Sequence, residues 1–243
     1  MNATNPQAFV EIAQRLASLP ADKKQLFRQR LAEKGIDSWR LPIVPAVGGE
    51  GTAVPLAHAQ LRFLSADALS SRALYNLCSV LRFDGRLDLT CLQQAMQQLV
   101  QRHTILRTRY VADAGGRLQA HCEPWTAGLP AVEPLPREAL ADPQQWCADE
   151  YARQLAEPFD LSLEVPWRWR AFSDAEQGST WLFFTIHHVA YDAWSAQQLT
   201  RELAEGYRAL SLGVPAQLPP LGIQYADYAA WEHEWLASDA CRQ

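Results

Sequence analysis

Two consecutive segments in the second half of the chain place the strongest constraint on its fold. The segment "TWLFFTI" (180–186) is apolar almost throughout, which is typical of a strand buried on both faces of a sheet. The preceding segment, "PWRWRAF" (166–172), alternates strictly between arginines and apolar or aromatic residues, as a strand does when its two faces meet different surroundings. A sheet that contains a doubly buried strand needs packed elements on both sides, so these segments predict a layered fold.

The rest of the chain interleaves strand-like and helix-like segments. Hydrophobic patterns and turn residues indicate further strands at 77–83, 105–111 and 117–123. One helix is expected after Asp88, with Leu92, Met96, Leu99 and His103 on one face. Another is expected after Asp142-Pro143, with Cys147, Tyr151 and Leu155 on one stripe. A third is predicted from a capping box of Ser195 and Gln198, and a last one across "YADYAAWEHEW" (225–235). This order predicts an α/β fold, an α+β layered sandwich in which helices flank a mixed sheet.

The first 42 residues are expected to form a separate helical leader or docking segment. Asn5 and Pro6 are typical of a helix start, and a second helix is predicted to end at Gly35. Residues 43–54 are rich in Gly and Pro, which indicates a linker. The main domain is therefore predicted to span residues 55–243.

Composition excludes several classes of protein. The net charge is −5 and no basic run stands out, so nothing indicates binding to nucleic acid or to an anionic membrane. The 5 cysteines are scattered and lack CxxC spacing, which argues against a disulfide framework and for a reducing compartment. The N-terminus has no secretory signal, and no apolar run approaches the roughly 18 residues of a membrane helix. We therefore expect a soluble cytoplasmic protein.

The segment "FTIHHVAYDAWSA" (184–196) carries the main candidate for chemistry. His187 and His188 end a predicted strand, where neighbouring side chains point to opposite faces, so at most one of them can face a cavity. Asp192 follows in the turn before a helix. The residues alone leave three interpretations open: structural histidines with a helix-capping Asp192, a metal site, or a general base held by the turn. The metal interpretation lacks the glutamate of the metalloprotease motif.

Resemblance to a known family favours the third interpretation, a general base held by the turn. "HHVAYDAWS" (187–195) resembles the HHxxxDG motif of condensation domains in nonribosomal peptide synthetases, with Ala193 in place of the usual Gly. Other segments are similar to motifs of that family in the same order: "AHAQLRFL" (57–64), "YNL" (75–77), "RHTILRTRY" (102–110), "EPFDLSLEVPWR" (157–168) and "YADYAAW" (225–231). The leader is similar to the helical stretch ahead of such domains, notably in siderophore-type synthetases.

The resemblance implies a chloramphenicol-acetyltransferase-like fold, in which two lobes enclose a tunnel. The chain is similar to the N-terminal lobe, and the motifs of the C-terminal lobe have no counterpart in it. The implied reaction is amide (peptide) bond formation between an acyl or aminoacyl thioester donor and an aminoacyl acceptor. Carrier proteins present both substrates on phosphopantetheine, so no directly bound cofactor is expected. A metal is not expected either, because the motif lacks the metalloprotease glutamate.

The implied partners are upstream and downstream peptidyl carrier proteins, the missing C-terminal lobe and an adenylation domain. Without the second lobe the chain is expected to be inactive. Three alternatives remain: a non-catalytic truncated fragment, a carrier-docking module, or another acyltransferase of the same superfamily.

The resemblance also assigns roles to residues around the motif. His188 is the expected catalytic base, or the group that orients the acceptor amine. His187 and Asp192 are expected to be structural, and Arg62 is the expected ion-pair partner of Asp192. Ala193 keeps its backbone N–H, so a donor role there survives unless its φ angle is positive. Trp194 is expected to support the site.

Three residues outside that motif are candidates for either substrate contact or structure. Arg102 and His103 come from the second motif, and a structural role is expected for both. Tyr225 begins a series of aromatic residues at helical spacing, for which a place in the core is expected. The other members of the series are Tyr228, Trp231 and Trp235.

Overall fold

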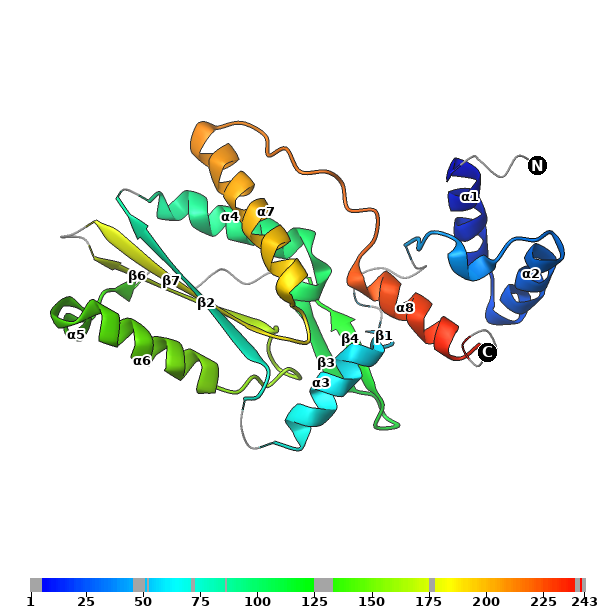
Figure 1. Ribbon diagram of the computed structural model, residues 1–243, viewed down its shortest axis with the longest axis horizontal. Helices are drawn as coiled ribbons and strands as arrows, with labels where there is room; N and C mark the ends of the chain where they lie inside the picture. Colours follow the sequence, from blue (N-terminus) through cyan, green and yellow to red (C-terminus); the bar gives the residue numbers. More distant parts are fainter. Residues whose placement is uncertain are drawn as a thin grey trace.

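The computed structural model describes residues 6–45, 51, 53–70, 73–85, 87–124, 133–174, 178–238 and 241. The expected helix start at Asn5 and much of the linker 43–54 lie outside the described residues. Figure 1 shows the larger sheet, here called the central sheet, at one end of the molecule. The leader helices lie at the other end, and a small second sheet lies between them. Both marked chain ends lie on the leader side of the molecule.

The central sheet has the strand order β2-β7-β6-β5. Its members are β2 (Asn76–Asp84), β7 (Ser179–His187), β6 (Trp167–Asp174) and β5 (Glu133–Pro134). β7 pairs antiparallel with both β2 and β6, and all nine of its residues are buried. The predicted doubly buried strand is confirmed, and it forms the middle of the sheet.

Helices cover both faces of this sheet, as Figure 1 shows. One layer consists of α4 (Leu89–Arg102) and α7 (Ala193–Leu212), and the other of α5 (Arg137–Ala141) and α6 (Pro143–Ala156). The main core joins Met96 of α4 to Trp167 and Leu182 of the sheet. Phe183 lies on the opposite face with Trp146 of α6. The alternation along β6 and β7 therefore distributes large side chains between two cores, and the layered fold class is confirmed.

The second sheet has the order β1-β4-β3, with β1 (Ala53–Val54), β4 (Leu118–Cys122) and β3 (Thr108–Ala112). The strand expected at 105–111 begins only at Thr108, because the 3-10 helix η2 (Thr104–Arg107) precedes it. Arg107 is buried there and donates to the carbonyl of Glu123 (3.0 Å). Two further helices flank this region, α3 (His58–Ala68) and α8 (Tyr225–Leu236).

Three expectations about helices are wrong in detail. α6 buries Glu150 and Gln154, whereas Tyr151 of the expected stripe is 39% exposed. Glu150 can be buried because Arg170 of β6 and Arg153 bind its carboxylate (3.0 and 2.6 Å). α7 begins at Ala193 rather than at Ser195, and His103 is the C-cap of α4 rather than a member of its apolar face. No helix among the described residues has the length and apolar character needed to cross a membrane.

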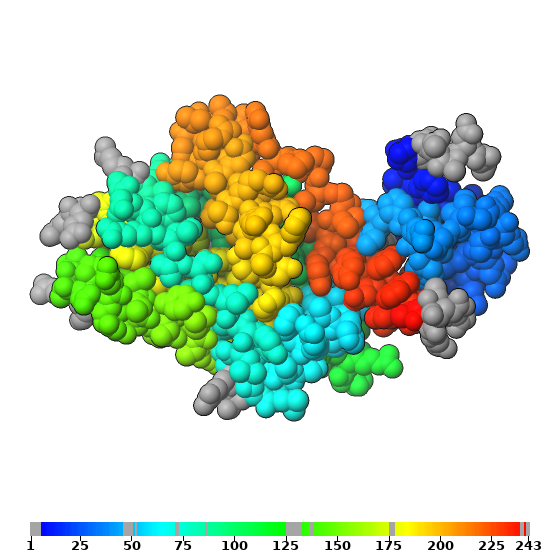
Figure 2. Space-filling view, viewed as in Figure 1, coloured from blue at the N-terminus to red at the C-terminus, as the bar shows by residue number. Residues whose placement is uncertain are grey.

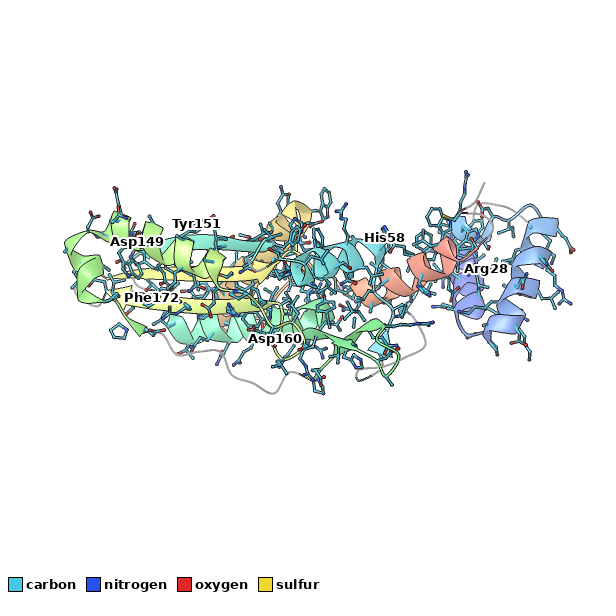
Figure 3. The ribbon with its side chains drawn as sticks, turned by 90° about the horizontal axis from the view of Figure 1, so that it is seen from below. Arg28, His58, Asp149, Tyr151, Asp160 and Phe172 are labelled. Carbon is cyan, nitrogen blue, oxygen red and sulfur yellow. The ribbon has the colours of Figure 1, made fainter. Side chains whose placement is uncertain are left out.

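The leader forms α1 (Pro6–Ala17), α2 (Ala21–Glu33) and the 3-10 helix η1 (Ser38–Arg40) around a small core of its own. Lys24 and Arg28 both bind Glu234 of α8 (2.5 and 2.7 Å). Figure 2 shows the atoms of the leader against α8, and Figure 3 places Arg28 beside the end of that helix. Trp39 meets Trp231 edge-on, with ring centroids 6.4 Å apart. The leader thus packs on the last helix of the main domain.

Candidate active site

A cavity of about 300 Å³ lies beyond the C-terminal end of β7. Residues from several helices and from the turn after β7 line it: Ala59, Gln60, Arg62 and Phe63 of α3, Ile105 of η2, Tyr225 of α8, His188, Val189, Ala190, Tyr191 and Asp192 of the turn, and Ser195 of α7. The cavity therefore brings together residues from the first motif, the histidine motif and the last helix, which are far apart in the sequence.

His188 faces this cavity and is held mainly by packing. Its ring stacks on Phe63, with centroids 4.6 Å apart and planes inclined by 26°. Its backbone N–H donates to the carbonyl of Tyr75 (2.8 Å). Nδ1 is buried and has no hydrogen-bond partner among the described residues. The imidazole is thus held by a ring contact, while its Nδ1 makes no hydrogen bond within the described chain.

His187 lies behind the cavity and is only 1% exposed. Its Nδ1 accepts from the backbone N–H of Val189 (3.0 Å), and its Nε2 lies 2.6 Å from Oδ2 of Asp67. Because Nδ1 accepts a hydrogen bond, the ring proton is on Nε2 and is donated to Asp67. Burial lowers the pKa of His187 below its ordinary value, although the hydrogen bond and charge of Asp67 oppose this effect. His187 is therefore neutral at neutral pH.

Only His188 of the histidine pair lines the cavity, in agreement with the expectation that at most one of the two rings faces it. Alternation along a strand is not the reason, because β7 ends at His187 and His188 lies outside the strand. The alternation argument also did not predict that both rings contact α3. Asp67 was also missed, because the segment after Arg62 was not recognised as a helix. Helical spacing from Phe63, which stacks on His188, would have placed Asp67 one turn further along the helix, next to His187.

Asp192 is the N-cap of α7. Its Oδ1 accepts from the backbone N–H and the hydroxyl of Ser195 (2.7 and 2.6 Å), and these bonds hold the pKa of Asp192 below its usual value. Arg62 lines the same cavity, but its guanidinium lies over the Phe63 ring, 5.3 Å from the centroid. No ion pair joins Arg62 to Asp192 in the described part of the chain. The expectation of that pair is corrected: the carboxylate serves the helix terminus instead.

A double-mutant cycle tests this assignment. We expect Asp192→Ala to lower the free energy of unfolding by about 1 kcal/mol, the usual loss for an N-cap, and Arg62→Ala to change it by less than about 0.5 kcal/mol. The two effects should add within about 0.5 kcal/mol in urea denaturation. Asp88→Ala is the matched control, since Asp88 caps α4 through the N–H of Cys91 (3.0 Å). A coupling energy above about 1 kcal/mol would show that Arg62 and Asp192 interact in solution.

The two residues after Asp192 differ in their relation to the site. Ala193 is the first residue of α7, and no described residue other than glycine has a positive φ angle. The change from the family's Gly therefore introduces no backbone strain here. Trp194 is 81% exposed and does not line the cavity, so its expected support of the site stays a prediction.

Arg102 and His103 lie outside the cavity and bind a buried carboxylate of α7. Glu202 is 3% exposed, and its Oε2 is 3.0 Å from Nε of Arg102 and 2.6 Å from Nε2 of His103. Gln198 donates to the other carboxylate oxygen (3.0 Å). These contacts connect the end of α4 to the middle of α7.

Tyr225 lies at the cavity rather than in the core. It is 36% exposed, and burial of the remainder raises its pKa to about 12, so its hydroxyl stays protonated at neutral pH. Gln224, which precedes it, accepts from the N–H and hydroxyl of Thr104 (both 3.1 Å) and donates to the carbonyl of Arg102 (3.0 Å). The second motif thereby anchors the start of α8. Within the described ranges, no group of three or more His, Cys, Asp or Glu could hold a metal ion.

Comparison with known proteins identifies the family of this site. Residues 50–243 match the family model described as Condensation domain. The chain belongs to the condensation-domain family. Condensation-domain structures of known fold include the first condensation domain of the CDA synthetase, with a TM-score of 0.66 and 25% identity over 78% of this chain and 48% of that one. The X-domain from teicoplanin biosynthesis matches with a TM-score of 0.69 and 31% identity over 82% of this chain and 42% of that one.

Curated relatives of this condensation-domain chain are large synthetases. One of the linear gramicidin synthase proteins of Brevibacillus parabrevis is 35% identical over 82% of the chain. Phosphinothricin tripeptide synthetase PhsC of Streptomyces viridochromogenes is 33% identical over 93% of it. The chain spans 4% of the first relative and 21% of the second. It therefore corresponds to a small part of each of these proteins.

Proposed function

We propose that the chain serves in amide-bond formation between a carrier-bound acyl or aminoacyl thioester and a carrier-bound aminoacyl acceptor. The observation that carries this proposal is the ring of His188, which lines the cavity beyond the C-terminal end of β7. Membership of the condensation-domain family supports the same reaction class. Phosphopantetheine arms of carrier proteins would bring both substrates to this cavity.

In the proposed reaction, His188 acts on the acceptor amine. The amine nitrogen attacks the thioester carbonyl, a C–N bond forms, the C–S bond breaks, and the thiol of the donor's phosphopantetheine leaves. The proton lost by the amine passes to the imidazole of His188 and from there to the departing sulfur. A positioned general base contributes typically about 10²–10⁴-fold to a rate, and alignment of two reactants contributes about 7–11 kcal/mol in favourable cases. Alignment of the substrates thus contributes more to the rate than the base does.

The other residues of the histidine motif support His188 in this proposal. His187 and Asp192 fix the turn on either side of it, through Val189 and through the N-cap of α7. Arg62 and Tyr225 contribute to the cavity wall. The backbone N–H of Ala193 lies in the first turn of α7, where an N–H has no acceptor within its own helix and can bind developing negative charge.

Carrier proteins on both sides, a C-terminal lobe and an adenylation domain are the proposed partners. The chain covers 42–48% of the two solved relatives, which supports a second lobe that would close the cavity. The test combines the chain with the C-terminal lobe of a condensation domain and with carriers loaded with a panel of aminoacyl thioesters. Amide product, followed by mass spectrometry, should appear only when chain, second lobe and both carriers are present. Absence of product across the panel would contradict the proposal.

A second candidate function is protein binding without chemistry. A structure that is 32% identical over 82% of the chain is described as a complex of the X-domain and OxyB from teicoplanin biosynthesis. That precedent favours a surface that binds a partner protein. Product formation in the reconstituted system would exclude this candidate as the sole function, whereas carrier binding without product would support it.

We infer that the leader contributes to contact with the donor carrier. Its similarity to siderophore-type synthetases also supports a siderophore as the product class. Deletion of residues 1–42 should raise the KM for the donor carrier severalfold and leave kcat within about twofold, because removing an interaction made before the chemical step weakens binding alone. Glu234→Ala is the control, since it removes the ion pairs to Lys24 and Arg28 but keeps the leader. An unchanged KM would assign the leader to packing on α8.

A further inference from the structure

One face of α3 contacts three consecutive residues of the histidine turn. Gln60 donates from Nε2 to the carbonyl of Val189 (3.4 Å), Phe63 stacks on His188, and Asp67 accepts from His187 (2.6 Å). Positions 60, 63 and 67 follow the spacing i, i+3, i+7, which is one face of an α-helix. A single rigid element therefore holds the backbone and both rings of the turn.

The hydrogen bonds of His187 connect this helix to the main chain on the far side of His188. Nδ1 of His187 accepts from the N–H of Val189 (3.0 Å), which requires the ring proton to be on Nε2. Asp67 supplies the acceptor for that proton and so stabilises this tautomer. With the other tautomer, Nδ1–H and the N–H of Val189 would be two opposed donors, and the turn would have to open.

The position of Asp67 would lower the stability of the fold if its carboxylate did not bind His187. Asp67 lies in the last turn of α3, where the helix dipole disfavours a negative charge. Its Oδ1 is buried and has no hydrogen-bond partner among the described residues. A carboxylate with one unpaired buried oxygen loses solvation that a neutral side chain would not lose. The bond from Oδ2 to His187 offsets this cost.

We propose that Asp67 is a positioning residue for His188. It holds His187 as the neutral Nε2–H tautomer, this tautomer binds the N–H of Val189, and the turn is thereby fixed on both sides of His188. Phe63, one helical turn earlier, orients the ring itself. The catalytic consequence rests on the proposed function of His188, but the tautomer and the fixed turn do not.

The first test measures the chain itself by NMR after labelling its histidines with ¹⁵N. In the unmodified chain, His187 should be the neutral Nε2–H tautomer at pH 7. In Asp67→Ala, its ring should populate the other tautomer, and the amide of Val189 should exchange roughly five- to tenfold faster, as expected for loss of one hydrogen bond. Asp67→Asn should restore both signals, because an amide oxygen also accepts. Ser65→Ala, an exposed change on the same helix, is the control.

The second test compares kinetics in the reconstituted system. Asp67→Ala should lower kcat at least about tenfold with KM unchanged, since a displaced base affects the transition state alone. Asp67→Asn should recover most of the loss. An Nδ1–H or protonated His187 in the unmodified chain would overturn the proposal, even if Asp67→Ala failed to fold. If His188→Ala abolished turnover while Asp67→Ala kept full turnover, the positioning role of Asp67 would be refuted and the proposed function would stand. Full turnover in His188→Ala would instead refute the proposed function.

Discussion

Replacing His188 by alanine is expected to lower amide formation by about 10²–10⁴-fold in the reconstituted two-lobe system, the usual contribution of a positioned general base. The free energy of unfolding should fall by no more than about 1.5 kcal/mol, because the ring's main contact is the stack on Phe63 and its buried Nδ1 loses no hydrogen bond to the described residues. Steady-state kinetics with loaded carriers and urea denaturation of the same preparation measure the two effects. His188→Ala should therefore lose most of its activity and keep most of its stability.

His187→Ala is the matched comparison, since the two residues are adjacent and identical in type. His187 is 1% exposed, and its loss leaves the carboxylate of Asp67 and the N–H of Val189 without their partner. An unsatisfied buried group costs about 1–3 kcal/mol, so we expect a loss of roughly 3 kcal/mol for this variant. Normal urea midpoints together with equal loss of turnover in both variants would contradict the division of roles between the two rings.

Replacing Glu202 by alanine is expected to lower the free energy of unfolding by about 3 kcal/mol, the lower end of the range for breaking a buried ion pair. Its side chain is 2% exposed and binds Arg102, His103 and Gln198. Arg102 and His103 are each 20% exposed and can partly return to water, which places the effect at the lower end of that range. Chemical denaturation at pH 7 measures the change.

The same carboxylate predicts a pH dependence. Burial alone would raise the pKa of Glu202, but hydrogen bonds from His103 and Gln198 and the charges of His103 and Arg102 hold it below the ordinary 4.5. A carboxyl group with a lowered folded-state pKa stabilises the fold above its unfolded-state pKa and loses this effect as the pH falls through the folded-state value. The unmodified chain should therefore lose more stability than Glu202→Ala as the pH falls below the ordinary carboxyl value of 4.5. Parallel profiles for the two proteins would show that Glu202 is not bound to these partners.

The sheet could be predicted because its pattern of burial follows directly from residue type. Segments 166–172 and 180–186 correspond to β6 and β7, and their periodicity reflects how many faces of each strand are covered. The helix α6 was predicted from its start at Asp142-Pro143, but the side chains that it buries could not be predicted in the same way. It buries Glu150 and Gln154 because Arg170 and Thr185 of the sheet supply their partners, at sequence separations of 20 and 31 residues.

α3 was recognised by its motif and not as a helix. Its buried residue is Gln60, which binds Tyr110 and the turn after β7, so the helix has no clear apolar stripe. An amphipathic pattern appears only when a helix buries apolar side chains against the core. For this reason hydrophobic periodicity could not identify Asp67 as the partner of His187.

The sequence by itself determined the family, the order of the longer strands and of most helices, and the place of the histidine pair at the end of a buried strand. These features depend on local residue type and on motifs that are contiguous in the chain. Tertiary structure decided that His187 binds Asp67, that Asp192 caps α7 instead of pairing with Arg62, and that Tyr225 lines the cavity. A polar side chain binds whichever group the packed elements bring within about 3 Å, and that choice depends on packing between segments far apart in the sequence.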